Sequence, residues 1–290
     1  MTREPPQLLA GLAVTRAGRP PEEAETVVLV HGLGSSTTVW NLVAPALAER
    51  FALVLVDLPG HGAAPLPDGE DPLEVMRPAA LGARLVRACR ELGVPRVHLA
   101  GHSLGGWVAL EAAAEDGAAA CEGAAPVVAS VVALAPAGLW ERPRRRPPLV
   151  PTGQQFARLG RRLPRSLLRR RWARRLVLVA TSAAPGRLPE EVALDAVTAV
   201  ESAAGYRAAD AGIAAGRFTR GPDVRAVAAV AFGIRDRVLP APRAQLRSAA
   251  PAACRWLVWD RCGHVPPWDR PADCARLIAE VVAEAAGRGG

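Results

Sequence analysis

Short apolar runs rich in β-branched residues alternate along this chain with longer stretches whose apolar residues recur at helical spacing. This alternation is typical of the α/β class, in which a mostly parallel sheet carries helices on both faces. The apolar runs predict strands near residues 8–15, 26–31, 51–57, 96–102, 127–135, 226–233 and 254–259. The periodic stretches predict helices near residues 39–49, 75–92, 104–116, 242–250 and 271–286.

The pattern changes between Gly138 and Pro222, where the chain is helical in character, broken by prolines and rich in arginine. We therefore predict that residues 1–138 and 223–290 form an α/β core and that residues 139–222 are a helical insertion. The charge is concentrated there: residues 141–175 contain 13 arginines and one glutamate, whereas the net charge of the whole chain is only +8.

Two interpretations of this basic segment remain open. It is either a solvated helical face or a docking surface for an anionic partner, such as a carrier protein, a phosphorylated substrate tail or membrane headgroups. Nucleic acid is not expected as a partner, because the arginines are not interleaved with aromatic residues that stack on bases.

Length and composition fit one large domain with an insertion. Half of the 290 residues are hydrophobic, which predicts a well-buried core. No uninterrupted stretch of about 18 or more apolar residues is free of charge, so no transmembrane helix is indicated. The short apolar stretch near the N-terminus follows Glu4, Pro5 and Pro6, so it reads as a first strand and not as a signal peptide. These features predict a cytoplasmic protein.

Several cofactor chemistries are excluded by the sequence. All 36 basic residues are arginine, which removes a P-loop, a pyridoxal-phosphate Schiff base and a Ser-Lys dyad. No Gly-x-Gly-x-x-Gly follows a predicted strand, and the five cysteines lack metal-ligand spacing. We therefore expect no cofactor and no metal, and chemistry that relies on serine, histidine, aspartate and backbone amides.

The strongest candidate for such chemistry is Gly-His-Ser-Leu-Gly at residues 101–105, between a predicted strand and a predicted helix. This arrangement is typical of a nucleophile elbow, a strained turn that lifts a serine hydroxyl over the N-terminus of the next helix. Gly101 and Gly105 meet the need for small neighbours two residues from Ser103. Ser103 is therefore the candidate nucleophile, and the amide of Leu104 is one candidate oxyanion donor.

Three further motifs follow predicted strands. His-Gly-Leu-Gly occupies residues 31–34, Gly-Ile-Arg-Asp-Arg-Val-Leu-Pro occupies residues 233–240, and Gly-His-Val-Pro-Pro occupies residues 263–267. His264 is the candidate base, because Gly263 frees the backbone to direct its ring and the other four histidines have plausible structural roles. A base is required because a serine hydroxyl is a poor nucleophile at neutral pH.

These motifs, in this order, resemble the α/β-hydrolase-fold superfamily and its cap-bearing group of serine esterases, lipases and haloperoxidase-like enzymes. The resemblance extends from about residue 7 to about residue 286, and includes the Asp57–Gly62 loop. It implies that residues 139–222 are a cap over the site, that Asp236 is the acid that orients His264, and that Leu33 supplies the second oxyanion amide. Asp57 is the rival acid, but it follows the wrong strand and more plausibly organises its own loop.

Other residues are candidates for the lining of a substrate pocket: His31, Gly32, His102, Trp40, Trp140 and Trp268. For any one tryptophan, packing in the core is the alternative. Cys262 lies close to His264 in sequence, but a cysteine nucleophile is not expected because Ser103 already occupies the elbow.

The leading hypothesis is a serine hydrolase that cleaves an ester or thioester with an apolar acyl group through an acyl-enzyme. Relatives with this core also perform perhydrolysis, carbon–carbon bond hydrolysis, lyase and cyclisation reactions, which the sequence does not separate. A thioesterase that serves an acidic acyl-carrier protein through the arginine-rich segment is a further alternative. A non-catalytic scaffold is disfavoured because every catalytic position holds a competent residue.

Overall fold

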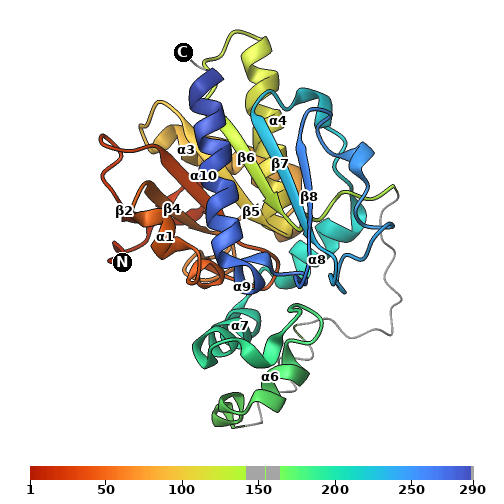
Figure 1. Cartoon of the computed structure of the whole chain (residues 1–290). Coiled ribbons are helices and arrows are strands. Elements are labelled where there is room, and N and C mark those ends of the chain that lie inside the picture. The colour runs from red at the N-terminus through yellow and green to blue at the C-terminus, as the bar shows by residue number, and fades with distance from the viewer. Residues whose placement is uncertain (142–153, 155–163, 289–290) are drawn as a thin grey trace.

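The computed structural model describes residues 1–141, Gln154 and residues 164–288 (Figure 1). The described strands form one eight-stranded sheet in the order β1-β2-β4-β3-β5-β6-β7-β8. In this sheet order, each pair of neighbouring strands from β4 to β8 is parallel. The strand β2 pairs antiparallel with both β1 and β4. The strands are β1 Gln7–Leu9, β2 Leu12–Gly18, β3 Thr26–Val30, β4 Ala52–Asp57, β5 Val97–His102, β6 Val128–Leu134, β7 Val227–Gly233 and β8 Arg255–Trp259.

Helices cover both faces of this sheet, as the alternating pattern predicts (Figure 1). The described helices are η1 Thr37–Trp40, α1 Ala44–Ala48, α2 Pro72–Val75, α3 Pro78–Glu91, α4 Leu104–Cys121, η2 Arg165–Arg169, α6 Arg171–Val177, η3 Pro185–Arg187, α7 Glu190–Ser202, α8 Tyr206–Ala215, η4 Gly221–Asp223, η5 Arg247–Ala249, α9 Pro266–Asp269 and α10 Pro271–Arg288. Apolar residues of α3 and α4 form the core on one face, and those of α1 and α10 form the core on the other. The prediction of an α/β fold with a mostly parallel sheet covered by helices is confirmed.

Four local predictions are wrong. The single strand predicted at 8–15 is a hairpin, because Ala10 and Gly11 both adopt positive φ, at 48° and 80°. The helix predicted at 39–49 divides into η1 and α1, and that at 75–92 divides before Pro78, whose ring suits a helix start but not an interior. The helix predicted at 242–250 is replaced by turns and the short η5.

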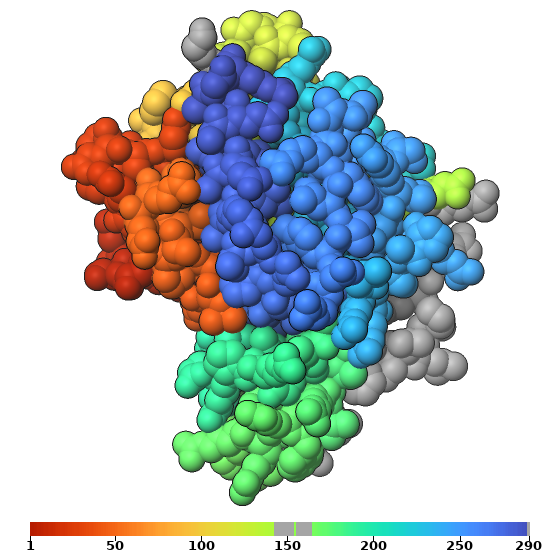
Figure 2. Space-filling view, in the orientation of Figure 1, coloured from red at the N-terminus to blue at the C-terminus, as the bar shows by residue number. Residues whose placement is uncertain are grey.

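The described part of the insertion between β6 and β7, residues 164–222, lies mainly beyond the carboxyl ends of the parallel strands (Figure 1). In the space-filling view, η2, α6 and α7 form a lobe that projects from the body (Figure 2). This lobe has its own small apolar cluster, built around Leu168, Leu178 and Val192, which reaches the body through Leu42 and Trp268. No helix within the described residues is both long enough and apolar enough to span a bilayer.

Candidate active site

Ser103 occupies a strained turn between β5 and α4. Its φ of 54° and ψ of −116° lie outside the regions that side-chain-bearing residues favour. A Cβ added at Gly101 would lie 2.1 Å from the carbonyl oxygen of Gly105, and one added at Gly105 would lie 2.3 Å from the carbonyl oxygen of His31. The two glycines are therefore required by direct backbone contacts, and the hydroxyl of Ser103 remains partly exposed.

The three side chains predicted to act together lie in one line of hydrogen bonds. Nε2 of His264 is 3.0 Å from Oγ of Ser103, and Nδ1 of His264 is 2.9 Å from Oδ2 of Asp236. An ionised carboxylate only accepts hydrogen bonds, so Nδ1 of His264 donates and Nε2 is left free to accept the serine proton. The arrangement can therefore deprotonate Ser103 at the moment of attack.

Asp236 is held at both carboxylate oxygens. Oδ1 accepts from the amides of Val238 and Leu239 at 2.9 and 2.7 Å, which leaves Oδ2 directed at His264. Burial opposes ionisation of this 6% exposed side chain, but His264 and the two amides outweigh it and lower the pKa of Asp236 below its ordinary value. The carboxylate is therefore fixed in position and negatively charged beside the imidazole.

The candidate oxyanion donors approach Ser103 from two sides. Leu104 is the first residue of α4, where helix geometry leaves the amides without intrahelical acceptors and the helix dipole favours negative charge. The loop after β3 passes against the elbow, since a Cβ added at Gly32 would lie only 3.0 Å from Cβ of Ser103. Leu33 follows directly, and its amide donates to no acceptor within the described residues. Two amides near one hydroxyl suit a developing oxyanion.

His31 and His102 serve the loops around the site. His102 donates from Nε2 to the carbonyl oxygen of His264 at 2.9 Å, which ties the elbow to the base. His31 donates from Nδ1 to the carbonyl of Gly32 at 2.7 Å and accepts at Nε2 from the amide of Leu58 at 3.0 Å. Both rings are buried. Their hydrogen bonds support a positioning role, while their role in lining a pocket stays a prediction.

The rival acid Asp57 makes a different set of contacts. Its carboxylate accepts from the amides of Thr37 and Ala63 at 2.7 and 3.0 Å, and so joins the ends of two loops. Burial raises the pKa of Asp57 despite these amides. Among the described hydrogen bonds, Asp236 rather than Asp57 is the acid bonded to His264. Asp57 organises its own loop.

Three histidines near the site are held neutral by burial. Desolvation lowers the pKa of His31 and of His61 to about 4, and that of His102 to about 3. His61 donates from Nδ1 to the carbonyl of Pro59 at 3.0 Å, and its ring lies 5.4 Å from that of His31. Their neutrality keeps additional positive charge away from His264.

The tryptophans named as candidate lining lie at varied depths. Trp40 is fully buried in the core on the α10 face, and Trp140 packs edge-on against Trp107, with ring centroids 5.6 Å apart. Trp268 is partly buried where the core meets the cluster of the insertion. These positions favour core packing for Trp40 and Trp140, and the lining role of all three stays a prediction.

Cys262 is unsuited to act as a nucleophile. Its side chain is fully buried and donates to the carbonyl of Gly263 at 3.6 Å. Burial raises the pKa of the Cys262 thiol to about 12, so the thiol stays protonated at neutral pH.

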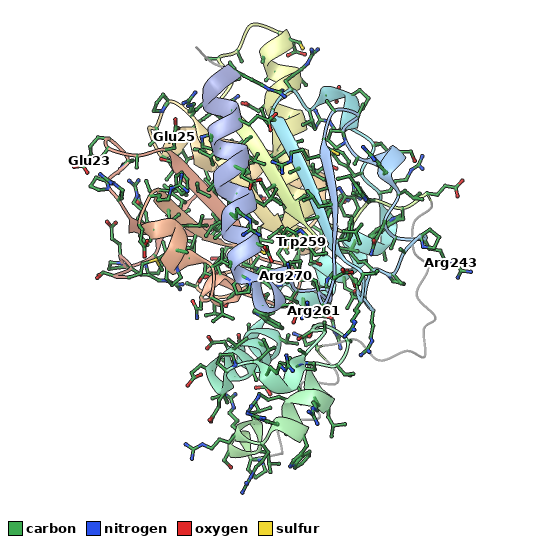
Figure 3. The ribbon with its side chains drawn as sticks, viewed as in Figure 1. Glu23, Glu25, Arg243, Trp259, Arg261 and Arg270 are labelled. Carbon is green, nitrogen blue, oxygen red and sulfur yellow. The ribbon has the colours of Figure 1, made fainter. Side chains whose placement is uncertain are left out.

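Asp269, for which no sequence pattern predicts a role, has a carboxylate that joins the insertion to the loop that carries His264. Oδ2 accepts from the amides of Gly263 and Ala183 at 2.7 and 2.8 Å, and Oδ1 accepts from the hydroxyl of Ser182 at 2.6 Å. The amide of Val265 adds a bond to the carbonyl of Thr181 at 2.9 Å. Figure 3 labels the neighbouring Arg270 at the edge of the body that faces the insertion.

Tyr206 makes a second unforeseen contact with the site. A Cβ added at Gly34, where φ is 63°, would lie 2.7 Å from the ring of Tyr206, the chain's single tyrosine. The amide of Gly205 donates to the carbonyl of Gly60 at 3.0 Å beside it. The start of α8 and the candidate oxyanion loop are thus packed together. An isolated tyrosine far along the chain carries no sequence signal for such a contact.

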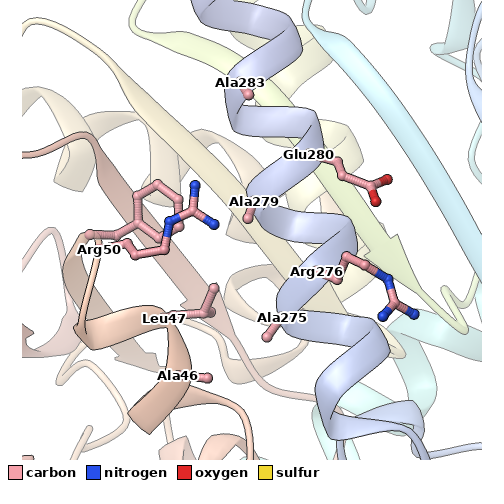
Figure 4. Close-up of a pocket in the computed structure, with 9 residues that line it drawn as sticks. Ala46, Leu47, Arg50, Ala275, Arg276, Ala279, Glu280 and Ala283 are labelled. Atoms are coloured by element: carbon pink, nitrogen blue, oxygen red, sulfur yellow. The ribbon is translucent and has the colours of Figure 1, made fainter.

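A hollow elsewhere on the surface shares no residue with this site. It has a volume of about 400 Å³ and lies between α1 and α10, lined by residues such as Leu47, Arg50 and Glu280 (Figure 4). Within the described part of the chain, no group of three or more His, Cys, Asp or Glu side chains is placed to hold a metal ion.

The sequence of this chain is similar to those of known hydrolases. A sequence profile of the alpha/beta hydrolase family matches residues 27–277. A pimeloyl-[acyl-carrier protein] methyl ester esterase of Methylococcus capsulatus is 41% identical over 104 residues, which are 36% of this chain and 35% of that protein. The matched stretch is thus only about a third of that relative's length.

Two solved structures share the fold over almost the whole chain. A bacterial membrane phospholipase A has a TM-score of 0.71 at 23% identity, covering 98% of this chain and 86% of that one. A meta-cleavage product hydrolase from Pseudomonas fluorescens IP01 has a TM-score of 0.71 at 19% identity, covering 97% and 98%.

Replacement of Asp269 by asparagine is expected to loosen the joint between the insertion and the His264 loop. Asparagine removes the negative charge and replaces one acceptor oxygen by a donor, so the bonds from the Gly263 and Ala183 amides weaken even where the Ser182 hydroxyl reverses to accept from the new NH2 group. We expect a loss of about 1–3 kcal/mol in the free energy of unfolding. Hydrogen exchange of the Ala183 and Gly263 amides should accelerate about tenfold or more.

Asp273→Asn is the matched control for this variant, because Asp273 lies on the adjoining turn and pairs with Arg270 and Arg276 near the surface. Surface pairs contribute little, so this control should leave both amides protected. Equal exchange in the two variants would contradict the role of Asp269.

Acidification is expected to destabilise the protein through its buried histidines. Between pH 6 and pH 5 an unfolded histidine, with a pKa of about 6.5, takes up a proton that folded His61, with its pKa of about 4, does not. The unfolded state then binds more protons, so stability falls as pH falls. His61→Asn keeps a donor for Pro59 and removes this proton, which should reduce the slope by about 1.4 kcal/mol per pH unit.

Urea unfolding of both proteins at several pH values measures these slopes. At pH 8, His61 is neutral in both the folded and the unfolded protein. The difference in unfolding free energy between the two proteins at that pH gives the cost of the substitution itself. Parallel pH dependences of the two proteins below that value would show that His61 takes up its proton in the folded state.

Proposed function

The chain belongs to the alpha/beta hydrolase family, and on that premise we propose that it is a serine hydrolase that cleaves a carboxylic ester or thioester through an acyl-enzyme. The observation that carries the proposal is the continuous hydrogen-bonded line from Ser103 through His264 to Asp236. The family match and the esterase among the relatives support a hydrolytic enzyme.

In the proposed acylation step, Nε2 of His264 takes the proton of Ser103 as Oγ attacks the substrate carbonyl carbon. The carbonyl oxygen becomes negatively charged and is bound by the amides of Leu33 and Leu104. When the tetrahedral intermediate collapses, His264 gives the proton to the departing alcohol or thiol. Water, activated by the same imidazole, then releases the acid and restores the serine.

Asp236 acts through His264 in this proposal. Its carboxylate fixes the tautomer that accepts at Nε2, and its negative charge stabilises the imidazolium formed in each half-reaction. Because the pKa of Asp236 is below its ordinary value, the carboxylate stays ionised under any condition in which the imidazole can act as a base.

We assign residues 139–222 as the cap of this enzyme; residues 142–153 and 155–163 of this segment lie outside the described residues. Support comes from the contacts of Asp269 with Ser182 and Ala183, and from the packing of Tyr206 on Gly34. Both contacts lie on loops that carry candidate catalytic groups. A cap attached to these loops would shape the acyl pocket and exclude water from the acyl-enzyme.

Removal of the proposed nucleophile should abolish turnover. We expect Ser103→Ala and His264→Ala to lower kcat/KM for a p-nitrophenyl ester by roughly 10⁴–10⁶-fold, and Asp236→Asn by somewhat less. A fluorophosphonate should form a covalent adduct with the folded wild type and with Cys262→Ala, but not with Ser103→Ala. Mass spectrometry locates the adduct. If Ser103 stays unmodified in folded protein that has been incubated with excess fluorophosphonate, that result would count against the acyl-enzyme.

The bond cleaved is tested by a direct comparison of substrates. We expect p-nitrophenyl esters or acyl thioesters of some chain length to be hydrolysed with a higher kcat/KM than a vinylogous diketone. Release of the chromophore or thiol measures hydrolysis of the esters and thioesters. Loss of the dienol absorbance measures hydrolysis of the diketone. A preference for the diketone in wild type, lost in Ser103→Ala, would assign carbon–carbon bond hydrolysis instead.

A further inference from the structure

The helix α6 and the residues just after it carry an unusual concentration of exposed apolar side chains. In and just after α6, Trp172 is 55% exposed, Leu176 is 69% exposed and Val177 is 51% exposed. Val179, two residues beyond the helix, is 47% exposed. Within the described part of the chain these are four of the nine large hydrophobic side chains that are well exposed, and the other five are scattered over separate segments.

Arginines are interleaved with these apolar residues. Residues 164–180 contain no aspartate or glutamate. Arg174 is buried and donates to the carbonyls of Leu168 and Arg169, and exposed Arg169 pairs with Glu190. Exposed Arg170, Arg171 and Arg175 have no carboxylate within salt-bridge distance among the described residues. The positive charge on this surface is therefore largely uncompensated.

We define the α6 surface as Trp172, Leu176, Val177 and Val179 together with Arg170, Arg171 and Arg175. We propose that it docks on a bilayer surface that contains anionic lipids. The apolar side chains would enter the region between headgroups and acyl chains, where tryptophan is favoured. The arginines would keep their guanidinium groups among the phosphates while their methylenes follow the apolar residues inward.

The position of α6 suits a broad, flat partner. The lobe that carries α6 projects away from the body, so α6 reaches an extended surface before the body does (Figures 1 and 2). A convex projection with exposed apolar side chains matches a soft planar surface, whereas a folded protein partner must supply a complementary hollow. The mixture of large apolar residues and unpaired arginines therefore favours a lipid surface over an acidic protein.

The α6 surface is also joined to the candidate active site. The chain leaves α6 through Val179, whose carbonyl accepts from Nη1 of Arg237 at 2.7 Å, and reaches Thr181, whose carbonyl accepts from Val265 beside His264. Docking would therefore hold this connecting segment and the His264 loop close to the bilayer. The proposal concerns binding and does not depend on which bond the enzyme cleaves.

Vesicle sedimentation tests the proposal with the full-length protein. We expect wild type to bind vesicles of equal parts phosphatidylcholine and phosphatidylglycerol, to bind far less to phosphatidylcholine alone, and to be released by salt. Combined Arg170→Gln, Arg171→Gln and Arg175→Gln should weaken partitioning on the order of 100-fold. Combined Trp172→Ser and Leu176→Ser should weaken it by about tenfold or more.

Matched controls change the same residue types elsewhere on the surface. Arg87, Arg243 and Arg247, all exposed, are replaced together by glutamine, and Leu8 and Leu73, which are 56% and 53% exposed, are replaced together by serine. Figure 3 shows Arg243 on the body, away from α6. The arginine control loses the same charge, and the leucine control loses two well-exposed apolar side chains, but both should bind like wild type. Thermal unfolding checks that every variant is folded.

Three results would overturn the proposal. The first is equal sedimentation of wild type with the two kinds of vesicle, and the second is binding of the α6 variants that equals that of their controls. In the third result, wild type binds neither kind of vesicle but binds a purified acidic acyl carrier protein, and the α6 arginine variant loses that binding. That result would assign the surface to a carrier protein.

Discussion

The contacts of the backbone around Ser103 are the constraint on which the rest of the site depends. Gly101, Gly105 and Gly32 allow the elbow, the first turn of α4 and the loop after β3 to approach within distances that a Cβ would prevent. The same approach places the serine hydroxyl at a helix N-terminus and within reach of His264, and brings the loop that carries Leu33 against the elbow. Strain at one residue is maintained because three packed segments hold it.

The loops that bear the candidate catalytic groups are tied to one another as well as to the sheet. His102 binds the carbonyl of His264, and Asp269 binds the amide of Gly263. The backbone is therefore held both at His264 and at the residue before it. Asp269 and Tyr206 extend these ties to the insertion. The insertion is consequently part of the framework of the site, and its position and that of the imidazole are linked by buried or partly buried hydrogen bonds.

Charge is distributed in two contrasting ways in this molecule. Around the site, burial keeps His31, His61 and His102 neutral, so the ionised Asp236 and the imidazole of His264 dominate the local electrostatics. On the α6 surface, unpaired arginines lie beside exposed apolar side chains and solvent screens them. The first arrangement supports chemistry at a buried imidazole, and the second supports recognition of an extended anionic surface.

The sequence alone predicts the alternation of strands and helices, the elbow and the order of the site motifs. These features are local: β-branched runs predict strands, and two glycines around a serine predict a tight turn. It misassigned the segment at 242–250 and the hairpin at Ala10, where tertiary contacts and turn geometry override helical or strand propensity. The resemblance already favoured Asp236 over Asp57, and the structure places the Asp236 carboxylate against His264. The bonds by which Asp269 joins the insertion to the His264 loop, and the packing of Tyr206 on Gly34, are visible in the tertiary structure alone. Each of these contacts joins residues from separate loops or elements, and the distance between such residues is set by how the sheet and the insertion pack, which no local pattern encodes.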